Sequence, residues 1–274
     1  MKKSLLYYWG VAILMLFLSV GFSACGGDDD EEEIGGESYR PVLLSTAKPF
    51  SISPTKKVYF ASGNLQYQPS TNQWRFAEHQ WDIIGENNKE ISNYSSWIDL
   101  FGWGTGDTPL KTSTNEKDYT TWTDWGKNIG DGKTWFTLSS DEWDYFYKNH
   151  SHHMIELNGV EGDLFLPDGA KWLYYGDGGD IFDFGDGKIL KITEYDRNAS
   201  WNELEEAGAL FLPRTYSRYG TNFYNHSYLY WSSTVDSETN AYIISAYTIN
   251  IINGEIYYSP TFFGYSVRLV RLAK

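Results

Sequence analysis

Cysteine is almost absent from this chain, since Cys25 is the only one among 274 residues. A single cysteine excludes a disulfide within the chain. Because no cysteine follows Cys25, thiol catalysis by the chain from Gly26 onward is excluded as well. The chain beyond Cys25 must therefore hold its fold by core packing. One domain of about 225 residues is long enough to bury a core of that kind.

Basic residues are also scarce. The chain has 22 Lys and Arg against 36 Asp and Glu, which gives a formal net charge of -14. Six of the acids form one run, Asp28 to Glu33, so the rest of the chain is only mildly acidic. We expect no nucleic-acid partner, because such binding needs a basic footprint.

Recognisable catalytic motifs are lacking too. The chain has no Gly-x-Ser-x-Gly elbow and no zinc-binding helix motif, although composition alone leaves a Ser-His-Asp set open. The run Phe101–Gly106 has glycines in a dinucleotide-like spacing, but no βαβ pattern surrounds it, so these glycines are expected to form tight turns under packed indoles. We predict a non-catalytic protein without a cofactor.

The N-terminus has the layout of an export signal. A basic start, Met1–Lys3, is followed by the almost wholly apolar stretch Leu5–Phe22 and then by Ser23–Cys25. The cysteine directly after Ser-Ala resembles a bacterial lipoprotein signal. Residues 1–24 are therefore predicted to be a signal peptide and Cys25 the lipidated first residue. The alternatives are an uncleaved membrane anchor, or a chance cysteine beside an ordinary signal.

Residues 25–47 are predicted to be a lipidated, acidic and flexible tether. Six adjacent acids flanked by Gly cannot bury apolar surface and stay solvated. An acidic run directly after the cysteine also resembles the export signal of Bacteroides-type lipoproteins. That resemblance implies a protein lipid-anchored to the outer membrane and facing the cell exterior.

Residues 48–274 are predicted to form one domain. Lys57–Phe60 and Asn64–Tyr67 have strand composition, and a turn at Pro69–Asn72 leads to the partner strand Gln73–Phe76. Capping boxes predict two short helices, beginning at Ser139–Glu142 and at Ser200–Glu203 and the second ending at Gly208. Helical signals that are few and segregated among many strands indicate the α+β class.

Two polar clusters are candidate metal ligands. His150, His152 and His153 lack an accompanying Cys or carboxylate pattern, so we interpret them as a solvated helix end and predict no metal there. The Gly-rich loop from Tyr175 to Gly187 is oxygen-rich, but its acids are spaced by three, unlike an EF-hand. The favoured interpretation is a solvated surface loop, with weak calcium candidates at Asp177, Asp180, Asp183 and Asp186.

The segment 214–263 differs in composition from the rest of the chain. Tyr and Phe are interleaved there with Asn, Ser, Thr and Ile, and Lys is absent. Antibody binding loops use a similar mixture, in which Tyr supplies rigid contact area and small polar residues supply hydrogen bonds. This composition predicts a ligand-binding surface.

Four motifs carry a family resemblance. They are Leu138–Trp143, Gly208–Pro213, Tyr230–Ser233 and Gly264–Arg271. Together they resemble the Fibrobacter succinogenes major paralogous domain family, which is similar to the C-type-lectin fold of formylglycine-generating enzymes. The resemblance implies one C-type-lectin-like domain with two short helices, mostly antiparallel strands and long loops. It also implies that the first and last strands pair, with Val58–Tyr67 beside Ser266–Leu272.

The same resemblance bears on function. Some relatives are variable proteins of diversity-generating retroelements, in which adenine-containing codons are randomised. The composition of 214–263, with Gly220, Trp231, Gly254 and Gly264 as fixed positions, fits that hypothesis. Formylglycine generation needs C-terminal cysteines and calcium-dependent sugar binding needs Glu-Pro-Asn-type motifs. Neither activity is carried over, because this chain lacks both features.

The candidate ligand-binding residues follow from strand alternation. Ala241–Ile251 is expected to be a strand, with Tyr242, Ile244 and Ala246 packed inward and the other face outward. Flanking loops extend that face. The predicted set is Tyr216, Tyr219, Phe223, Tyr224, His226, Tyr228, Ile243, Ser245, Tyr247, Ile249, Ile251, Tyr257, Tyr258 and Phe262. The partner is an unknown protein or glycan. Two alternatives remain open. The strand could be buried on both faces, or the protein could be a structural or adhesin-type lipoprotein that uses this segment as a subunit interface.

Overall fold

The computed structural model describes residues 45–274, apart from 86–87, 89–94, 175–178, 194–195, 228, 237–239 and 246–254. The expected signal peptide, Cys25 and the acidic tether lie outside the described residues. No helix in the described part is long and apolar enough to cross a membrane.

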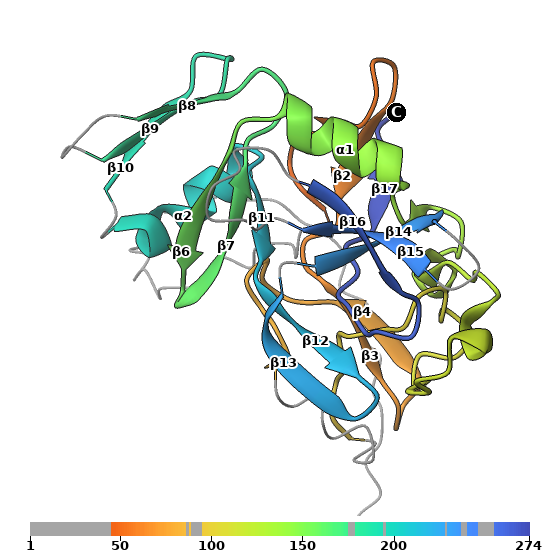
Figure 1. The fold of residues 1–274 in the computed structure, drawn as a ribbon. Helices are drawn as coiled ribbons and strands as arrows, with labels where there is room; N and C mark the ends of the chain where they lie inside the picture. Colours follow the sequence, from red (N-terminus) through yellow and green to blue (C-terminus); the bar gives the residue numbers. More distant parts are fainter. Residues whose placement is uncertain are drawn as a thin grey trace, which may run out of the picture. The chain divides into compact units, whose positions relative to one another are not determined.

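A central antiparallel sheet joins the two ends of the described chain (Figure 1). Its order is β1 (Phe50–Ser51), β2 (Lys57–Phe60), β17 (Val270–Leu272) and β5 (Trp135–Phe136). Val270 pairs with Phe60, and the amide of Leu65 donates to Val267 O at 2.9 Å. The expected pairing of Val58–Tyr67 with Ser266–Leu272 is therefore confirmed.

The hairpin predicted near residue 70 is also confirmed. β3 (Leu65–Gln68) pairs with β4 (Gln73–Phe76), and Asn72 has a positive φ of 52° in the connecting turn. The Tyr67 and Trp74 rings, opposite each other in the register, lie 4.7 Å apart. Cross-strand aromatic pairs of this kind stabilise a hairpin locally, which explains why its sequence was sufficient to predict it.

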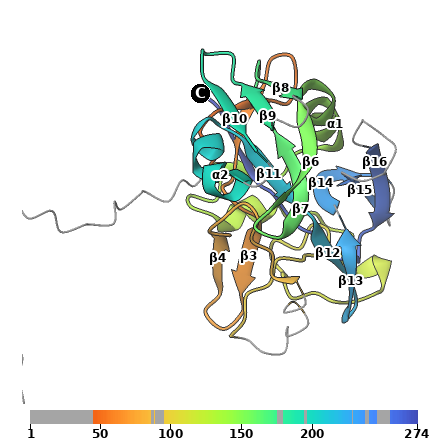
Figure 2. The ribbon, with the colours of Figure 1, turned by 90° about the vertical axis from the view of Figure 1, so that its left-hand side faces the viewer.

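The remaining strands form further antiparallel sheets (Figures 1 and 2). One has the order β11 (Leu210–Pro213), β7 (Val160–Phe165), β6 (His152–Leu157), and another the order β10 (Ile189–Ile192), β9 (Asp180–Asp183), β8 (Lys171–Tyr174). β12 (Thr215–Tyr219) pairs with β13 (Asn222–Ser227), and β14 (Leu229–Val235), β15 (Asn240–Ser245) and β16 (Glu255–Pro260) pair in that order. The described part is thus mostly antiparallel strand with two short helices, as the α+β class requires.

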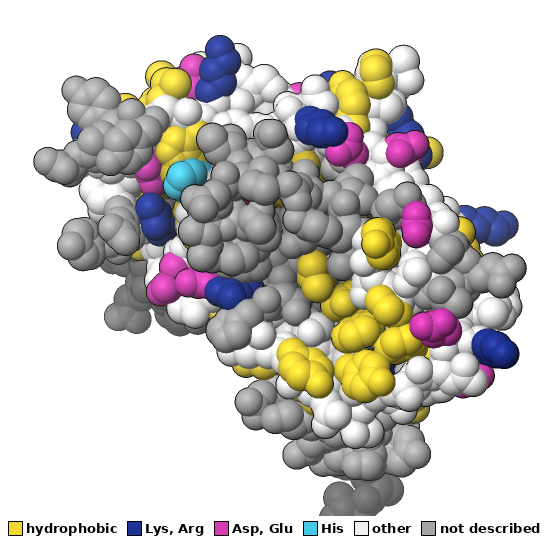
Figure 3. All heavy atoms as spheres, viewed as in Figure 1, with side chains coloured by type: hydrophobic (Ala, Val, Ile, Leu, Met, Phe, Trp, Pro, Cys, Tyr) yellow, Lys and Arg dark blue, Asp and Glu magenta, His cyan; other side chains and the backbone are white. Residues whose placement is uncertain are grey.

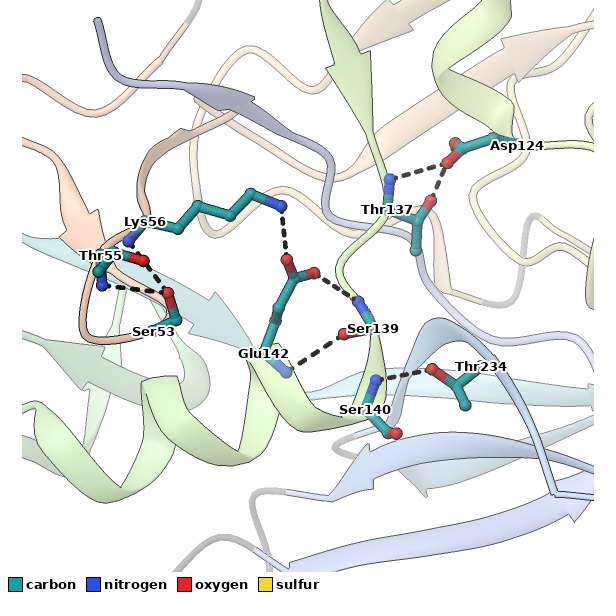
Figure 4. A network of polar contacts seen from close by, with 9 residues as sticks. All are labelled: Ser53, Thr55, Lys56, Asp124, Thr137, Ser139, Ser140, Glu142 and Thr234. Atoms are coloured by element: carbon teal, nitrogen blue, oxygen red, sulfur yellow. Dashed lines mark hydrogen bonds and ion pairs between the residues drawn. The ribbon is translucent and has the colours of Figure 1, made fainter.

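Helix α1 (Ser140–Asn149) begins at the predicted capping box. Ser139 Oγ accepts from the Glu142 amide at 3.3 Å, and Glu142 Oε2 accepts from the Ser139 amide at 2.9 Å (Figure 4). Lys56 pairs with the same carboxylate, and the Ser140 amide donates to Thr234 Oγ1 of β14. The helix start is therefore fixed locally, to the loop before β2 and to β14.

Helix α2 (Arg197–Glu206) differs from its prediction. It begins one turn earlier, with Asp196 as a cap residue whose side chain makes no capping bond, so Ser200 lies inside the helix and the second predicted capping box is wrong. The predicted end is confirmed, since Gly208 follows with a φ of 100°. Trp201 and Leu204 face a core cluster, and their burial decides where the helix lies.

The two serines predict a contrast in stability. Replacing Ser139 with Ala should lower the free energy of unfolding by about 1 kcal/mol, because a cap is lost. Ser200→Ala should be neutral or slightly stabilising, because Ala is the better residue inside a helix. Urea unfolding of both variants measures the difference, and equal losses would contradict the assignment of the helix starts.

Short 3₁₀ helices and aromatic rings fill the region between β4 and β5. η2 (Glu116–Tyr119) and η3 (Trp125–Asn128) flank the indole of Trp122, which lies 4.8 Å from Trp103. A Cβ on Gly102 would lie 2.4 Å from the Tyr119 ring, so only Gly fits there. Gly102 thus allows close packing under an aromatic ring, as expected from the sequence, whereas Gly104 and Gly106 lie closest to the backbone of residues 121–124.

Arg268 is fully buried and joins segments distant in sequence. Its Nε donates to Asn64 Oδ1 at 3.0 Å and its Nη1 to Ala61 O at 3.0 Å. Its Nη2 donates to Gln80 O and Phe211 O at 3.3 and 3.2 Å. Burial lowers the pKa of Arg268, but an arginine stays charged in proteins, so these acceptors solvate the cation in place of water.

Asp163 on β7 is a buried acid, and no described group donates to its Oδ2. Burial raises the pKa of Asp163 to about 7. A raised folded-state pKa contributes stability that is present below the unfolded value of about 4 and is lost as the pH rises through the folded value.

Asp163→Asn should therefore stabilise the protein most at alkaline pH. The free energy of unfolding of the variant should exceed that of the natural chain most at about pH 8. The difference should shrink toward pH 5, where the Asp163 carboxyl of the folded natural chain is largely protonated. Urea unfolding of both proteins at the two pH values measures it. A gain that does not change with pH would show that Asp163 is not held neutral by burial.

Candidate functional site

The hairpin β12–β13 presents the most exposed tyrosines of the segment 214–227 whose side chains are described. Ser217 pairs with Tyr224, and Tyr219 lies two residues along the same strand, so Tyr219 and Tyr224 share one face of the hairpin. Tyr219 is 36% exposed and Tyr224 51%. Gly220, which follows β12, has a positive φ of 58°.

A buried cation fixes this hairpin to the rest of the fold. Arg218 is fully buried, and its Nη1 and Nη2 donate at 3.1 Å to Gly220 O and Lys111 O. Burial lowers the pKa of Arg218. Backbone bonds in both directions join Arg218 to Gly264, at 2.9 and 2.8 Å, and a Cβ on Gly264 would come within 2.8 Å of the guanidinium. The hairpin and the turn after β16 are therefore one rigid unit.

Aromatic rings connect this unit to the core. The Tyr219 ring lies 5.5 Å from Phe262 and 5.3 Å from Phe263. Phe263 lies 5.9 Å from Tyr265, which in turn lies 4.9 Å from the fully buried Trp231. The ring contacts thus run without a break from the core to the surface and hold Tyr219 in place.

We call Tyr219, Tyr224, Phe262 and Phe263 the C-terminal aromatic surface. Figure 3 shows hydrophobic side chains gathered on the viewed face, in the region where Figure 1 draws the end of β12 and the turn after β16. Aromatic side chains held by packing bind partners at low entropic cost, so this surface is suited to contact a ligand.

The other predicted residues lie in several places. Tyr258 on β16 is 66% exposed. Tyr216 and Phe223 are half-buried, and Phe262 is only 9% exposed, packed beneath Tyr219 rather than standing free as expected. His226, Ile243, Ser245 and Tyr257 lie in strands β13, β15 and β16, but their side chains are outside the described part. Tyr228, Tyr247, Ile249 and Ile251 lie outside the described residues altogether.

The register of β15 gives the pairing partners of the residues in the predicted faces. Ala241 belongs by alternation to the set with Ile243 and Ser245, which was expected outside, yet Ala241 is fully buried. Ile243 pairs with the fully buried Trp231. Tyr242, assigned to the packed set, pairs instead with the exposed Tyr258. The side chains of residues 242–245 lie outside the described part, so the assignment of the two sets to the inner and outer faces stays a prediction.

Phe263 and Tyr265 were not among the predicted residues. Phe263 directly precedes the final motif, Gly264–Arg271, and Tyr265 lies within it. The adjacent aromatics of Phe262–Tyr265 were the available signal, since a turn rarely carries so many rings without a packing partner.

His150 is not the solvated residue that the sequence suggested. Its side chain is buried, with Nδ1 2.8 Å from Phe146 O and Nε2 2.7 Å from Asp168 Oδ1. Burial alone would raise the pKa of Asp168, but hydrogen bonds from Lys57, Ser51 and His150 outweigh it and hold that pKa well below its usual range. These groups tie α1 to β1 and β2, so their role is structural.

The other two histidines point to separate partners. His152 stacks on Phe165 at 4.8 Å, and burial lowers its pKa to about 4. His153 lies 4.8 Å from Trp172. The three imidazoles do not converge on one point. Among the described residues, no group of three or more His, Cys, Asp or Glu is placed to hold a metal ion.

The described part of the Asp-rich segment contains strand β9, which pairs with β8 on one side and β10 on the other, so it is not the surface loop expected throughout. Asp180 is buried and accepts from Trp172 Nε1 and Arg197, whereas Asp186 is exposed and pairs with Lys48. Asp183 accepts from the Gly185 amide in the turn, and Asp177 lies outside the described residues. The described carboxylates serve separate partners and do not form a calcium site.

Comparisons with protein-family models, with curated proteins and with solved structures found no match for this chain.

Proposed function

We propose that this protein is a non-catalytic, surface-displayed lipoprotein that binds a protein or glycan ligand through its C-terminal aromatic surface. The observation that carries the proposal is the exposed Tyr219, held by Phe262 and Phe263 above a buried stack of rings. A large aromatic side chain that is both exposed and rigid is a typical binding anchor. The lipid on Cys25 anchors the domain to the outer membrane, facing the cell exterior.

The same proposal includes the finer fold and the origin of the surface. The pairing of β2 with β17, together with two short helices, supports a C-type-lectin-like domain. The composition of segment 214–263 supports diversification by a retroelement. Genome sequence tests this: a reverse-transcriptase gene and a near-repeat of the segment that differs only at adenines are expected nearby. Absence of both rules out diversification without affecting ligand binding.

The binding surface is tested by removing its exposed rings. The ligand is first identified with a glycan array and a cell-surface pull-down. Tyr219→Ala and Tyr224→Ala should then each weaken binding by about 2 kcal/mol, because central tyrosines carry much of the energy of an interface. Each should change the free energy of unfolding by less than about 1 kcal/mol, because both side chains are substantially exposed.

Leu173→Ala is the matched control. Leu173 is also an exposed apolar residue, but it lies on β8 in a separate sheet, so this change should leave both binding and stability intact. If the tyrosine variants instead dissociate an oligomer, the surface is a subunit interface and the protein is a structural or adhesin-type lipoprotein. Unchanged binding in both tyrosine variants would refute the proposed site.

A further inference from the structure

A pocket of about 500 Å³ opens between β4, η3 and β5 and shares no lining residue with the C-terminal aromatic surface. Trp74 and Phe76 line the pocket from one face of β4. Ile129, which follows η3, and Trp135 of β5 complete the apolar wall, and the rings of Phe76 and Trp135 lie 4.7 Å apart. Trp74, Phe76 and Ile129 are half-buried, so the described residues leave part of their apolar surface uncovered.

The polar side chains around the pocket do not favour a polar ligand. Arg75 extends from the opposite face of β4, where its Nε donates to Gln66 Oε1 at 2.8 Å. Asn128 Nδ2 donates to Gly106 O at 2.8 Å. Glu78 is exposed, so water solvates its carboxylate. The lining is therefore better suited to aliphatic side chains than to a polar small molecule.

The described part of the chain begins beside this pocket. Ser45 forms an antiparallel bridge with Ala61, and the residue after Ala61, Ser62, lines the pocket. Arg271 Nη2 donates to Ser45 Oγ at 3.0 Å, and Arg271 pairs with Trp135 of the pocket wall across β17 and β5. Two separate contacts thus hold Ser45 next to neighbours of the lining residues.

An apolar run directly precedes Ser45. In an antiparallel pair, the residue before one partner lies opposite the residue after the other. One further position in the pairing of Ser45 with Ala61 therefore leads to Ser62, on the wall of the pocket. Residues 41–44 have the sequence Pro-Val-Leu-Leu and lie outside the described residues. At about 3.3 Å per residue, an extended run of this length spans about 13 Å, which is enough to cross the pocket.

We propose that residues 41–44 dock in this pocket and cover its aromatic wall. Burial of Val42, Leu43 and Leu44 there removes apolar surface of the run and of the wall from water together, whereas the acidic run Asp28–Glu33 stays solvated. The docked run sets the point at which the chain leaves the domain, beside β4 and β5. The inference goes beyond the proposed function and holds whether or not Cys25 is lipidated.

Methyl NMR of the full chain tests the contact directly. Ile129 supplies a methyl probe within the pocket, and its signal is assigned with Ile129→Val. The signals of Leu43 and Leu44 are assigned with Leu43→Ile and Leu44→Ile. A nuclear Overhauser effect between an Ile129 methyl and a methyl of Leu43 or Leu44 is expected. Absence of any such effect, with all three residues assigned, overturns the proposal.

Charges placed in the run should open the pocket. Indole should bind at the Ile129 methyl at least about tenfold more tightly in Leu43→Asp/Leu44→Asp than in the natural chain, because a run docked about nine-tenths of the time competes with it to that extent. Ile34→Asp/Tyr39→Asp is the matched control, because it adds the same two charges outside residues 41–44 and should leave the affinity for indole unchanged. Thermal unfolding confirms that both variants are folded.

The outcomes separate this contact from the proposed function. If indole shifts the Ile129 methyl equally in the natural chain and in Leu43→Asp/Leu44→Asp, or in neither, the run does not compete for the pocket and the proposal is overturned. If that variant does not fold, the Overhauser measurement in the natural chain decides. Tyr219→Ala should leave the methyl contact unchanged, and none of these results bears on the ligand of the C-terminal aromatic surface.

Discussion

Replacing Arg268 with Met should lower the free energy of unfolding by about 3 kcal/mol or more. The change removes the donors of four buried acceptors, which are Asn64 Oδ1 and the carbonyls of Ala61, Gln80 and Phe211. Each acceptor left without a partner costs about 1 to 3 kcal/mol where water cannot reach it. Urea unfolding followed by tryptophan fluorescence measures the loss.

Arg271→Met is the matched control for this prediction. Arg271 lies three residues further along the same motif, but it is half-buried, stacks 4.4 Å over the Tyr59 ring and donates one side-chain bond, to Ser45. Its loss should cost about 1 kcal/mol or less, because a partly exposed cation is replaced readily by water. Similar losses for the two variants would show that the buried network of Arg268 does not hold the chain together.

Replacing Trp231 with Ala should cost about 3 to 5 kcal/mol of stability and should also abolish ligand binding at the C-terminal aromatic surface. Trp231 is fully buried, its Nε1 donates to Phe101 O at 2.7 Å, and its ring supports Tyr265. Removing the indole leaves a cavity in the core and removes one of the two donors to Phe101 O, the other being the Tyr265 amide. Phe263 and Tyr219 are then no longer connected through ring contacts to a buried indole.

Two further variants separate these effects. Trp231→Phe keeps part of the packing and should lose less stability than Trp231→Ala. Tyr258→Ala, on the exposed side of the same sheet, should leave the free energy of unfolding nearly unchanged. If Trp231→Ala lost stability but bound the ligand normally, the proposed support of Tyr219 by the buried rings would be wrong.

Local features were readable from the sequence. The hairpin β3–β4 and the start of α1 follow from residues within a few positions of one another, whose turn, pairing and capping bonds form without help from distant segments. The same applies to Gly208 at the end of α2. The pairing of β2 with β17 is not local, and it was expected only from the family resemblance.

The sequence by itself determined the composition of the candidate surface, the α+β class and the absence of disulfides. Only the tertiary structure decided which residues are buried. Ser200 was predicted to cap a helix, but the packing of Trp201 places Ser200 inside α2. His150 was predicted to be solvated, but its hydrogen bond to Asp168 holds it in the interior. Arg218 and Arg268 have no local signal for burial, because their acceptors come from segments up to 207 residues away. Alternation along β15 defines two faces, but the choice between them depends on what packs against the sheet.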